Sequence, residues 1–322
     1  MDLWRFILTK LNNAINIQLL YVLESEGSSP GRQGFKMAVA ADGEFFGTIG
    51  GGIMEHKLVE KAKAMLHTVS CPHGPAGGQQ NENSVLLMRQ HHDKEHANNQ
   101  SGMICSGSQL NAFIPLTAAD KFTVEKIITA EKRSIQLSPK GLLVVDEVAT
   151  GLQYKTDTDW IYTEAINQQP IIHIIGGGHV SLALSELMNY LGFYVKLYDD
   201  RPELNTIVAN SFANEKHIVD YESLGNHFIN IENDYAVIMT IGYRTDKTVL
   251  KQLIDKPFFY LGLLGSQHKI ETLFKELKEE GITEELLEKI FSPIGLNIAS
   301  KTTKEIAVSI AAEIIGVKNK DG

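Results

Sequence analysis

The sequence predicts an α/β protein of two domains, an N-terminal α+β domain and a C-terminal domain built on a doubly wound parallel sheet. Three observations support this prediction. The chain has 322 residues, whereas one hydrophobic core usually serves no more than ~250–300 residues. From residue 171 onward, apolar runs alternate with segments of helical spacing, as in parallel sheets with crossover helices. That region opens with IIHIIGGGHVSLALSELMNYLGFYVKLYDD, which has the strand, glycine turn, helix and second strand of a nucleotide-binding βαβ unit.

The N-terminal domain is expected to span residues 1–168, with an edge and linker region from about residue 120. The Asp42-Gly43 step between two short apolar segments predicts a hairpin. Residues 70–101 are polar and rich in Gly, Asn and Gln, which favours an exposed loop around a short strand at 84–89. The other expected elements are a helix over 3–13, strands over 17–24, 36–41 and 44–50, a helix over 53–67, a strand over 109–116, and a helix with alternating strands over 120–165.

The C-terminal domain is expected to span residues 169–322, because Gln168-Gln169-Pro170 interrupts the pattern. The expected strands are 171–175, 193–198, a short strand near 218, 235–241 and 258–263. The expected helices are 180–190, one from 246, 267–279 and 303–315. Strands and helices that alternate at this spacing predict a Rossmann-like fold.

The glycine loop of this domain is the first candidate binding site. Residues 176–181, GGGHVS, fit G-x-G-x-x-G with Ser181 in place of the last glycine. Such a loop lets a pyrophosphate approach the backbone, and the following helix N-terminus attracts its charge. Asp199 ends the next strand, where an acid accepts from a ribose hydroxyl. The expected cofactor contacts are Gly176, Gly178, His179, Ser181 and Asp199. The alternatives are an empty Rossmann cleft and, for His179, ordinary packing.

The N-terminal domain carries a second candidate site in GSSPGRQG and GTIGGGIMEH. Consecutive glycines and serines expose backbone N–H groups, which form concave nests for phosphate or oxyanions. Arg32 is a possible bidentate partner of a phosphate, and Glu55 either caps the backbone or faces the ligand. The candidate residues are Ser28, Arg32, Gly50, Gly51, Gly52 and Glu55. The alternative is that these glycines only build tight turns.

Composition excludes several classes of function. A net charge of -9 without a basic stripe argues against nucleic-acid binding. Two cysteines are too few for a disulfide framework. No apolar run reaches the ~18 residues of a membrane span, and no signal peptide opens the chain, so a cytoplasmic location is expected. The five histidines between His67 and His96 are read as part of a solvated loop and not as a metal site.

Several segments together resemble one family. They are GSSPGRQGFKMAVAADGEFFGTIGGGIMEHKLVEKA, GMICSGSQLNAFI, IIGGGHVSLALSELMNYLGFYVKLYDDRPE, YLGLLGSQHK and FSPIGLNIASKTTKEIAVSIAAEII. The chain resembles the XdhC/CoxI family of xanthine dehydrogenase accessory proteins over most of its length. The resemblance implies a factor that binds the molybdopterin cofactor, assists its sulfuration and inserts it into a xanthine dehydrogenase-type molybdoenzyme. It also implies a cysteine desulfurase as a possible sulfur donor, and a homodimer.

Two positions carry further expectations from this resemblance. Cys105 matches a family cysteine that usually begins a Cys-Gly-Gly step, although Ser106 replaces the first glycine here. Its thiolate is expected to ligate molybdenum or to carry sulfur, and a buried apolar cysteine is the alternative. Arg244 stands where many relatives carry a histidine-bearing step, and it is expected to contact phosphate instead.

The leading interpretation is therefore a cofactor-binding chaperone rather than a turnover enzyme. The alternative is an NAD(P)-binding oxidoreductase that uses the C-terminal domain, and for that case Asp199 favours NAD over NADP.

Overall fold

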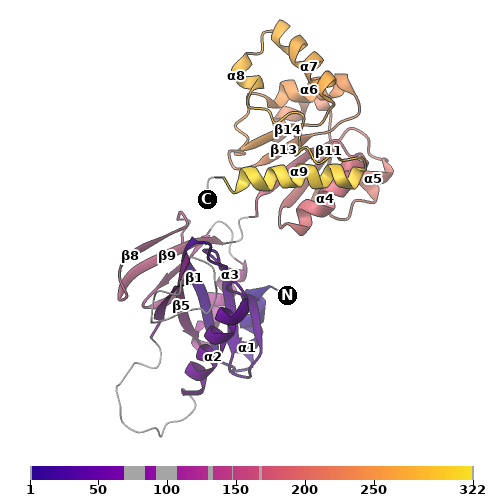
Figure 1. Cartoon of the computed structure of the whole chain (residues 1–322). Coiled ribbons are helices and arrows are strands. Elements are labelled where there is room, and N and C mark those ends of the chain that lie inside the picture. Colours follow the sequence, from indigo (N-terminus) through magenta and orange to yellow (C-terminus); the bar gives the residue numbers. More distant parts are fainter. Residues whose placement is uncertain are drawn as a thin grey trace. The chain divides into compact units, whose positions relative to one another are not determined.

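The computed structural model describes residues 2–68, 84–91, 107–129, 133–146, 148–166 and 169–320. The chain forms two compact units, Met1–Gln168 and Gln169–Gly322, here called the N-terminal and C-terminal units (Figure 1). The predicted fold class is confirmed, because an α+β unit precedes a unit with a parallel sheet. Cys105, Cys71 and most of the predicted loop at 70–101 lie outside the described residues.

The first sheet of the N-terminal unit is antiparallel, with the order β3-β2-β1-β5-β4. Its strands are β1 (Ile17–Gly27), β2 (Lys36–Ala40), β3 (Phe45–Thr48), β4 (Leu86–His91) and β5 (Gly107–Leu116). Helix α1 (Leu3–Asn12) packs with one set of β1 side chains and helix α2 (Gly52–Thr68) with the other. β1 is covered on both faces, which explains why its residues 19–23 form a continuous apolar run without alternation.

A second antiparallel sheet completes this unit, with the order β7-β6-β9-β8. It comprises β6 (Arg133–Ser138), β7 (Gly141–Asp146), β8 (Gly151–Thr156) and β9 (Asp159–Ile166), and it follows the turn η1 (Ala118–Asp120) and α3 (Lys121–Thr129). Glu164 on β9 links the two sheets. Its carboxylate accepts hydrogen bonds from Tyr21 on β1 and, at 2.6 Å, from Lys36 Nζ on β2.

The C-terminal unit contains a five-stranded parallel sheet with the order β12-β11-β10-β13-β14. Its strands are β10 (Ile171–Ile175), β11 (Tyr194–Asp199), β12 (Glu215–Ile218), β13 (Tyr235–Ile238) and β14 (Tyr260–Leu263). β11 and then β12 lie on one side of β10, and β13 and then β14 lie on its other side. The strand order therefore reverses between β10 and β13, and ligands of doubly wound sheets bind beyond the carboxyl ends of the strands at such a reversal.

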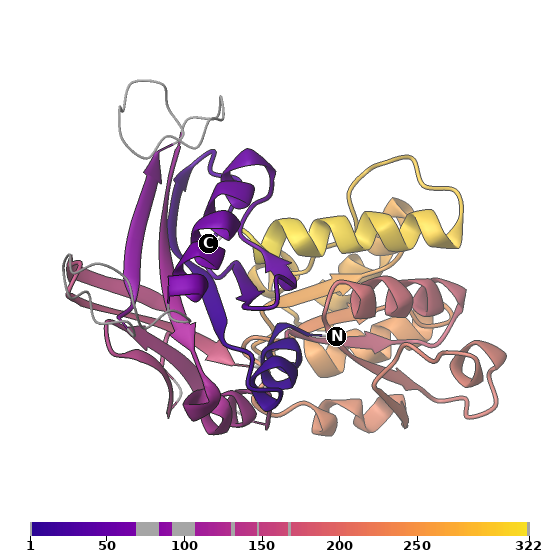
Figure 2. The ribbon, with the colours of Figure 1, turned by 90° about the horizontal axis from the view of Figure 1, so that it is seen from below.

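Helices cover both faces of the parallel sheet. On one face, α4 (His179–Tyr190) packs against α9 (Thr303–Lys318), the yellow helix of Figures 1 and 2. On the other face, α6 (Tyr243–Leu253), α7 (Gln267–Glu279) and the turn η2 (Tyr221–His227) share a second core cluster. The short helices α5 (Asn205–Val208) and α8 (Glu284–Leu287) complete the unit. No helix within the described ranges is long and apolar enough to cross a membrane.

Candidate functional site

The carboxyl edge of the parallel sheet gathers the N-termini of three helices. α4 follows β10, α6 follows β13 and α7 follows β14. The N-terminus of α7 is capped by the Ser266 side chain, whereas the N-cap residues of α4 and α6 are Gly178 and Gly242, which provide no side-chain cap. The first N–H groups of an uncapped helix must find water or a ligand, and the helix dipole makes an anion the favoured one.

The three glycines of the loop have different roles. Gly176 has φ +108°, and a Cβ there would lie 2.4 Å from the Met239 carbonyl oxygen. A Cβ on Gly177 would lie 2.4 Å from Ile207 Cγ1. A Cβ on Gly178, in contrast, would meet nothing within 4 Å. Packing therefore requires the first two glycines, and the third leaves open space beside the uncapped end of α4.

Two further predicted contacts flank this loop. Ser181 is fully buried and its hydroxyl has no partner in the described part of the chain, so its small size allows α4 to pack closely on the sheet. His179 begins α4 and its side chain is exposed.

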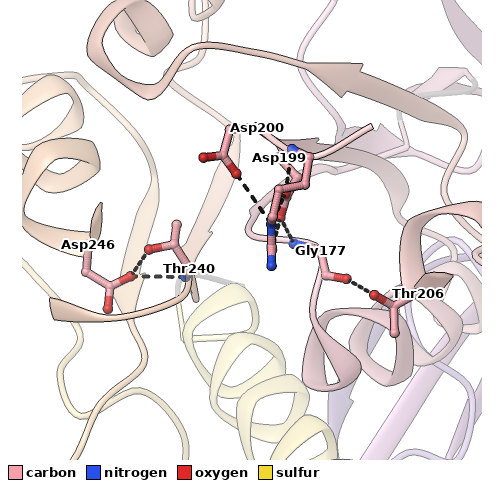
Figure 3. Close-up of polar contacts among 7 residues, drawn as sticks. Gly177, Asp199, Asp200, Thr206, Thr240 and Asp246 are labelled. Atoms are coloured by element: carbon pink, nitrogen blue, oxygen red, sulfur yellow. Dashed lines mark hydrogen bonds and ion pairs between the residues drawn. The ribbon is translucent and has the colours of Figure 1, made fainter. Parts of the chain in front are cut away.

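Asp199 lies at the end of β11, as predicted, but its carboxylate already accepts hydrogen bonds from neighbouring residues. Gly177 donates its amide hydrogen to Oδ2 at 2.6 Å, and Arg201 donates through its backbone amide, Nε and Nη2 at 2.9, 2.8 and 2.7 Å (Figure 3). Burial raises the pKa of this carboxyl, but the bonds from Arg201 and Gly177 outweigh burial and hold the pKa below its ordinary value. A role for Asp199 in holding a ribose stays a prediction, and it requires one of these bonds to open.

The segment after β11 is fixed to the glycine loop. Thr206 on α5 donates its hydroxyl hydrogen to the Gly177 carbonyl oxygen (Figure 3), while Ile207 fills the space above Gly177. The connection from β11 to α5 and the glycine loop therefore form one hydrogen-bonded assembly.

A lysine and an aspartate that the sequence reasoning did not select lie at the same edge. Asp246, in the first turn of α6, is fully buried and accepts from the Thr240 amide at 3.0 Å and from the Thr240 hydroxyl at 2.5 Å. Lys269 in the first turn of α7 donates to the other carboxylate oxygen. The sequence signal for Lys269 was its place at the end of GSQHK, the segment that follows β14 and begins α7. Arg244, which was selected, lies in the first turn of α6 and is exposed.

The structure brings together the two glycine-rich segments of the N-terminal unit. A Cβ on Gly50 would lie 2.4 Å from the Gly31 nitrogen, and a Cβ on Gly31 would lie 2.1 Å from the Ile49 carbonyl oxygen. Donors of the loop before α2 already have a carboxylate as their acceptor. Glu55 Oε2 accepts from the Thr48 hydroxyl at 2.6 Å and from the amides of Ile49 and Gly51 at 2.9 and 3.0 Å. Of the two roles considered for Glu55, backbone capping is the one that this conformation contains.

The remaining candidates of this unit have less structural support. Arg32 is exposed and donates, among the described residues, to the Gly27 carbonyl oxygen at 3.4 Å, and Ser28 is exposed. Cys105 lies outside the described residues. Among the residues that are described, no group of His, Cys, Asp and Glu side chains is arranged to hold a metal ion.

Comparisons with known proteins agree with both units. Residues 172–314 match the XdhC Rossmann domain, and residues 15–70 match the XdhC and CoxI family. The chain is 27% identical to the uncharacterized protein YqeB of Escherichia coli over 92% of this chain and 43% of that protein. It is 28% identical to a probable xanthine dehydrogenase subunit of Bacillus subtilis over 52% of this chain and 49% of that protein. The chain thus spans less than half the length of these curated relatives.

A solved structure shares the fold. The crystal structure of a xanthine dehydrogenase from Bacillus halodurans superposes with a TM-score of 0.69 at 22% identity, covering 100% of this chain and 97% of that one. At this level of identity the similarity concerns the fold of the chain.

Proposed function

Because this chain belongs to the XdhC and CoxI family, we propose that it is an accessory protein of a xanthine dehydrogenase-type molybdenum enzyme. In this role it binds the molybdopterin cofactor of that enzyme and acts as a chaperone, not as a turnover enzyme. The name of the Bacillus subtilis relative, a probable xanthine dehydrogenase subunit, supports a client of this type.

The observation that carries the proposal is the uncapped end of α4 beside the open face of Gly178. Molybdopterin carries a phosphomonoester, and free amide groups at a helix N-terminus suit such a dianion. Arg244, exposed in the first turn of α6, adds attraction for the phosphate, while Arg201 and Lys269 balance the carboxylates of Asp199 and Asp246 at the same edge. The residues present therefore fit the group. When bound, the cofactor supplies a redox-active metal with an exchangeable sulfur ligand to the client enzyme.

Apolar surface accompanies these charges. Ile241, in the loop between β13 and α6, is 68% exposed. Ligand sites combine apolar surface with a few placed polar groups. Ile241 thus offers a contact for the pterin ring, while Arg244 and the amides hold the phosphate.

Sulfuration and insertion into the client form the second part of the proposal. Cys105 would ligate molybdenum or carry the sulfur that a cysteine desulfurase supplies, and the protein would act as a homodimer. These roles rest on the family and on the preference of thiolates for soft metals. Substituting Cys105→Ala should abolish molybdopterin retention, and unchanged retention would remove this role.

The test of cofactor binding is the content of the protein purified from a host that makes molybdopterin. We expect pterin fluorescence and molybdenum to co-purify with it in a fixed ratio to protein. Protein that carries neither, although the host supplies both, would contradict the proposal.

An NAD(P)-dependent oxidoreductase is the second candidate, and the glycine loop with the reversal of strand order favours it. Its weakness is Asp199, whose carboxylate is taken up by Arg201 and Gly177. Titration with NADH separates the two candidates. Fluorescence quenching at micromolar NADH would support the oxidoreductase.

A further inference from the structure

Asp199 ends β11 and Asp200 follows it directly, and Asp199 has no free acceptor position. Asp199 Oδ1 accepts from the Arg201 amide and Nε, and Oδ2 accepts from the Gly177 amide and Arg201 Nη2. A carboxylate offers about four lone-pair positions. With four donors in place and a side chain that is 0% exposed, Asp199 cannot also accept from a ligand.

The second acid is free on one side. The side chain of Asp200 is 50% exposed, and its contact in the described structure is an ion pair from Oδ1 to Arg201 Nε at 3.4 Å. Figure 3 shows this carboxylate joined to the guanidinium that Asp199 holds. Asp199 fixes two of the guanidinium nitrogens, so the positive charge beside Asp200 is held in place.

A buried hydroxyl beside these acids lacks an acceptor. Tyr221 is 6% exposed, and its hydroxyl meets no acceptor among the residues that the structure describes. Burial raises the pKa of Tyr221, the charges of Asp199 and Asp200 raise it further, and the backbone amide of Asp200 lowers it. Buried polar groups are rarely left without a partner, and a bound ligand is one way to supply it.

We infer that Asp200, and not Asp199, is the residue that recognises the ligand at this edge, by accepting hydrogen bonds from two adjacent donors. Asp199 and Arg201 are positioning residues for it. The inference rests on the proposed function and deepens it. A pterin presents such a pair of donors in its 2-amino group and N3–H, and a dinucleotide presents one in the two ribose hydroxyls. A carboxylate matches either pair because both of its oxygens accept.

The test uses the full-length protein and two probes that differ at C2 and N1 of the ring. 6-Carboxypterin has the 2-amino group beside N3–H, whereas 6-carboxylumazine has an oxygen in its place and carries a hydrogen on N1, so it lacks the adjacent pair of donors. We expect the wild type to bind the pterin at least about tenfold more tightly, the effect of a hydrogen bond to a charged group. In D200N one acceptor becomes a donor, so the preference should disappear. E186Q, which removes the same charge from the exposed side of α4, should keep it.

A second pair of probes identifies the source of the donors. ADP and 2′-deoxy-ADP differ in one ribose hydroxyl. If only this pair is discriminated, and D200N removes the discrimination, Asp200 recognises a ribose, so the inference holds while the proposed pterin ligand fails. If D200N retains the preference of the wild type for either pair, or if the wild type discriminates neither, the inference is overturned. Equal urea midpoints for D200N and the wild type exclude misfolding as the cause.

Discussion

At the scale of single residues, one carboxylate holds each glycine loop in its folded shape. Glu55 accepts three hydrogen bonds from the loop before α2, and Asp199 joins the loop before α4 to Arg201. Both acids were selected from the sequence as ligand contacts. The structure gives them internal donors, so each loop is organised before any ligand arrives.

Removing the carboxylate of Glu55 should destabilise the N-terminal unit. Substituting Glu55→Ala leaves the Thr48 hydroxyl and the amides of Ile49 and Gly51 without an acceptor, which should lower the free energy of unfolding by about 1–3 kcal/mol. Both tryptophans of the chain, Trp4 and Trp160, lie in this unit, so tryptophan fluorescence during urea unfolding reports on it alone. E60A, at an exposed position of α2, is the control and should behave as the wild type. Equal midpoints for E55A and E60A would contradict this role of Glu55.

The lowered pKa of Asp199 predicts a dependence of stability on acid pH. The folded-state pKa lies below that of the unfolded chain, so the ionised carboxylate stabilises the fold at any pH above the unfolded value of about 3.9. This contribution is lost as the pH falls through the folded-state pKa. Urea midpoints of the C-terminal unit, measured as the circular-dichroism transition that tryptophan fluorescence does not follow, should therefore fall more steeply below about pH 4 in the wild type than in D199N. If the urea midpoints of the wild type and D199N change with pH in parallel, the hydrogen bonds of Asp199 do not stabilise the fold.

At the scale of elements, two glycines of the loop before α4 have different roles: Gly176 is needed for packing, and Gly178 leaves space for a ligand. Gly176 lies against the strand-end segment at Met239, whereas Gly178 faces open space at the start of α4. The same kind of close approach joins Gly31 and Gly50 in the N-terminal unit. Each loop thus contains glycines that the fold requires, and the loop before α4 contains one that the fold does not require.

Alanine at these two positions should give opposite results. G176A combines a positive φ with a Cβ 2.4 Å from the Met239 carbonyl oxygen, and it should unfold at a clearly lower urea concentration, by about 2 kcal/mol or more. G178A, with φ -72° and no neighbour within 4 Å, should keep the stability of the wild type. Because its methyl group faces the space beside the α4 amides, G178A should retain less pterin. A G178A protein with full ligand content would place the ligand elsewhere.

The elements differ in how far sequence could predict them. The parallel sheet was predictable because each strand, glycine turn and helix is local in sequence, and the positions of β10, α4 and β11 agree with the prediction to within a residue or two. The order of the N-terminal sheet was not predictable, because β5 pairs with β1 across a long separation in sequence. β1 also extends to Gly27 through a bulge next to Val22, which local spacing does not reveal.

The candidate site was predictable in position but not in its pairings. The glycine loop and the acid after β11 follow from spacing. That Arg201 takes up Asp199, while Asp200 keeps a half-exposed carboxylate, depends on side-chain directions at one strand end. The pair of Asp246 and Lys269 joins two helices that are distant in sequence. Such contacts form only when the strands and helices are assembled, so a local sequence pattern does not predict them.

At the scale of the whole molecule, the two units have separate cores. Two clusters of buried side chains belong to the N-terminal unit and two to the C-terminal unit. A unit with its own core is expected to unfold independently of its neighbour.

Chemical unfolding should therefore show two transitions. Tryptophan fluorescence should follow only the N-terminal unit, whereas circular dichroism at 222 nm should follow both. E55A should shift the tryptophan transition alone, and G176A should shift only the other transition. Residues 169–322 expressed alone should fold with the midpoint of the second transition. A single transition that both variants shift equally would contradict the independence of the units.

The central claim is that the carboxyl edge of the parallel sheet binds a phosphorylated pterin. The most direct test is mass spectrometry of the ligand released from wild type and G178A, both purified from a host that makes molybdopterin. We expect molybdopterin or its dinucleotide form from the wild type and a marked loss in G178A at unchanged stability. Release of a nicotinamide dinucleotide, or equal pterin content in both proteins, would contradict the claim.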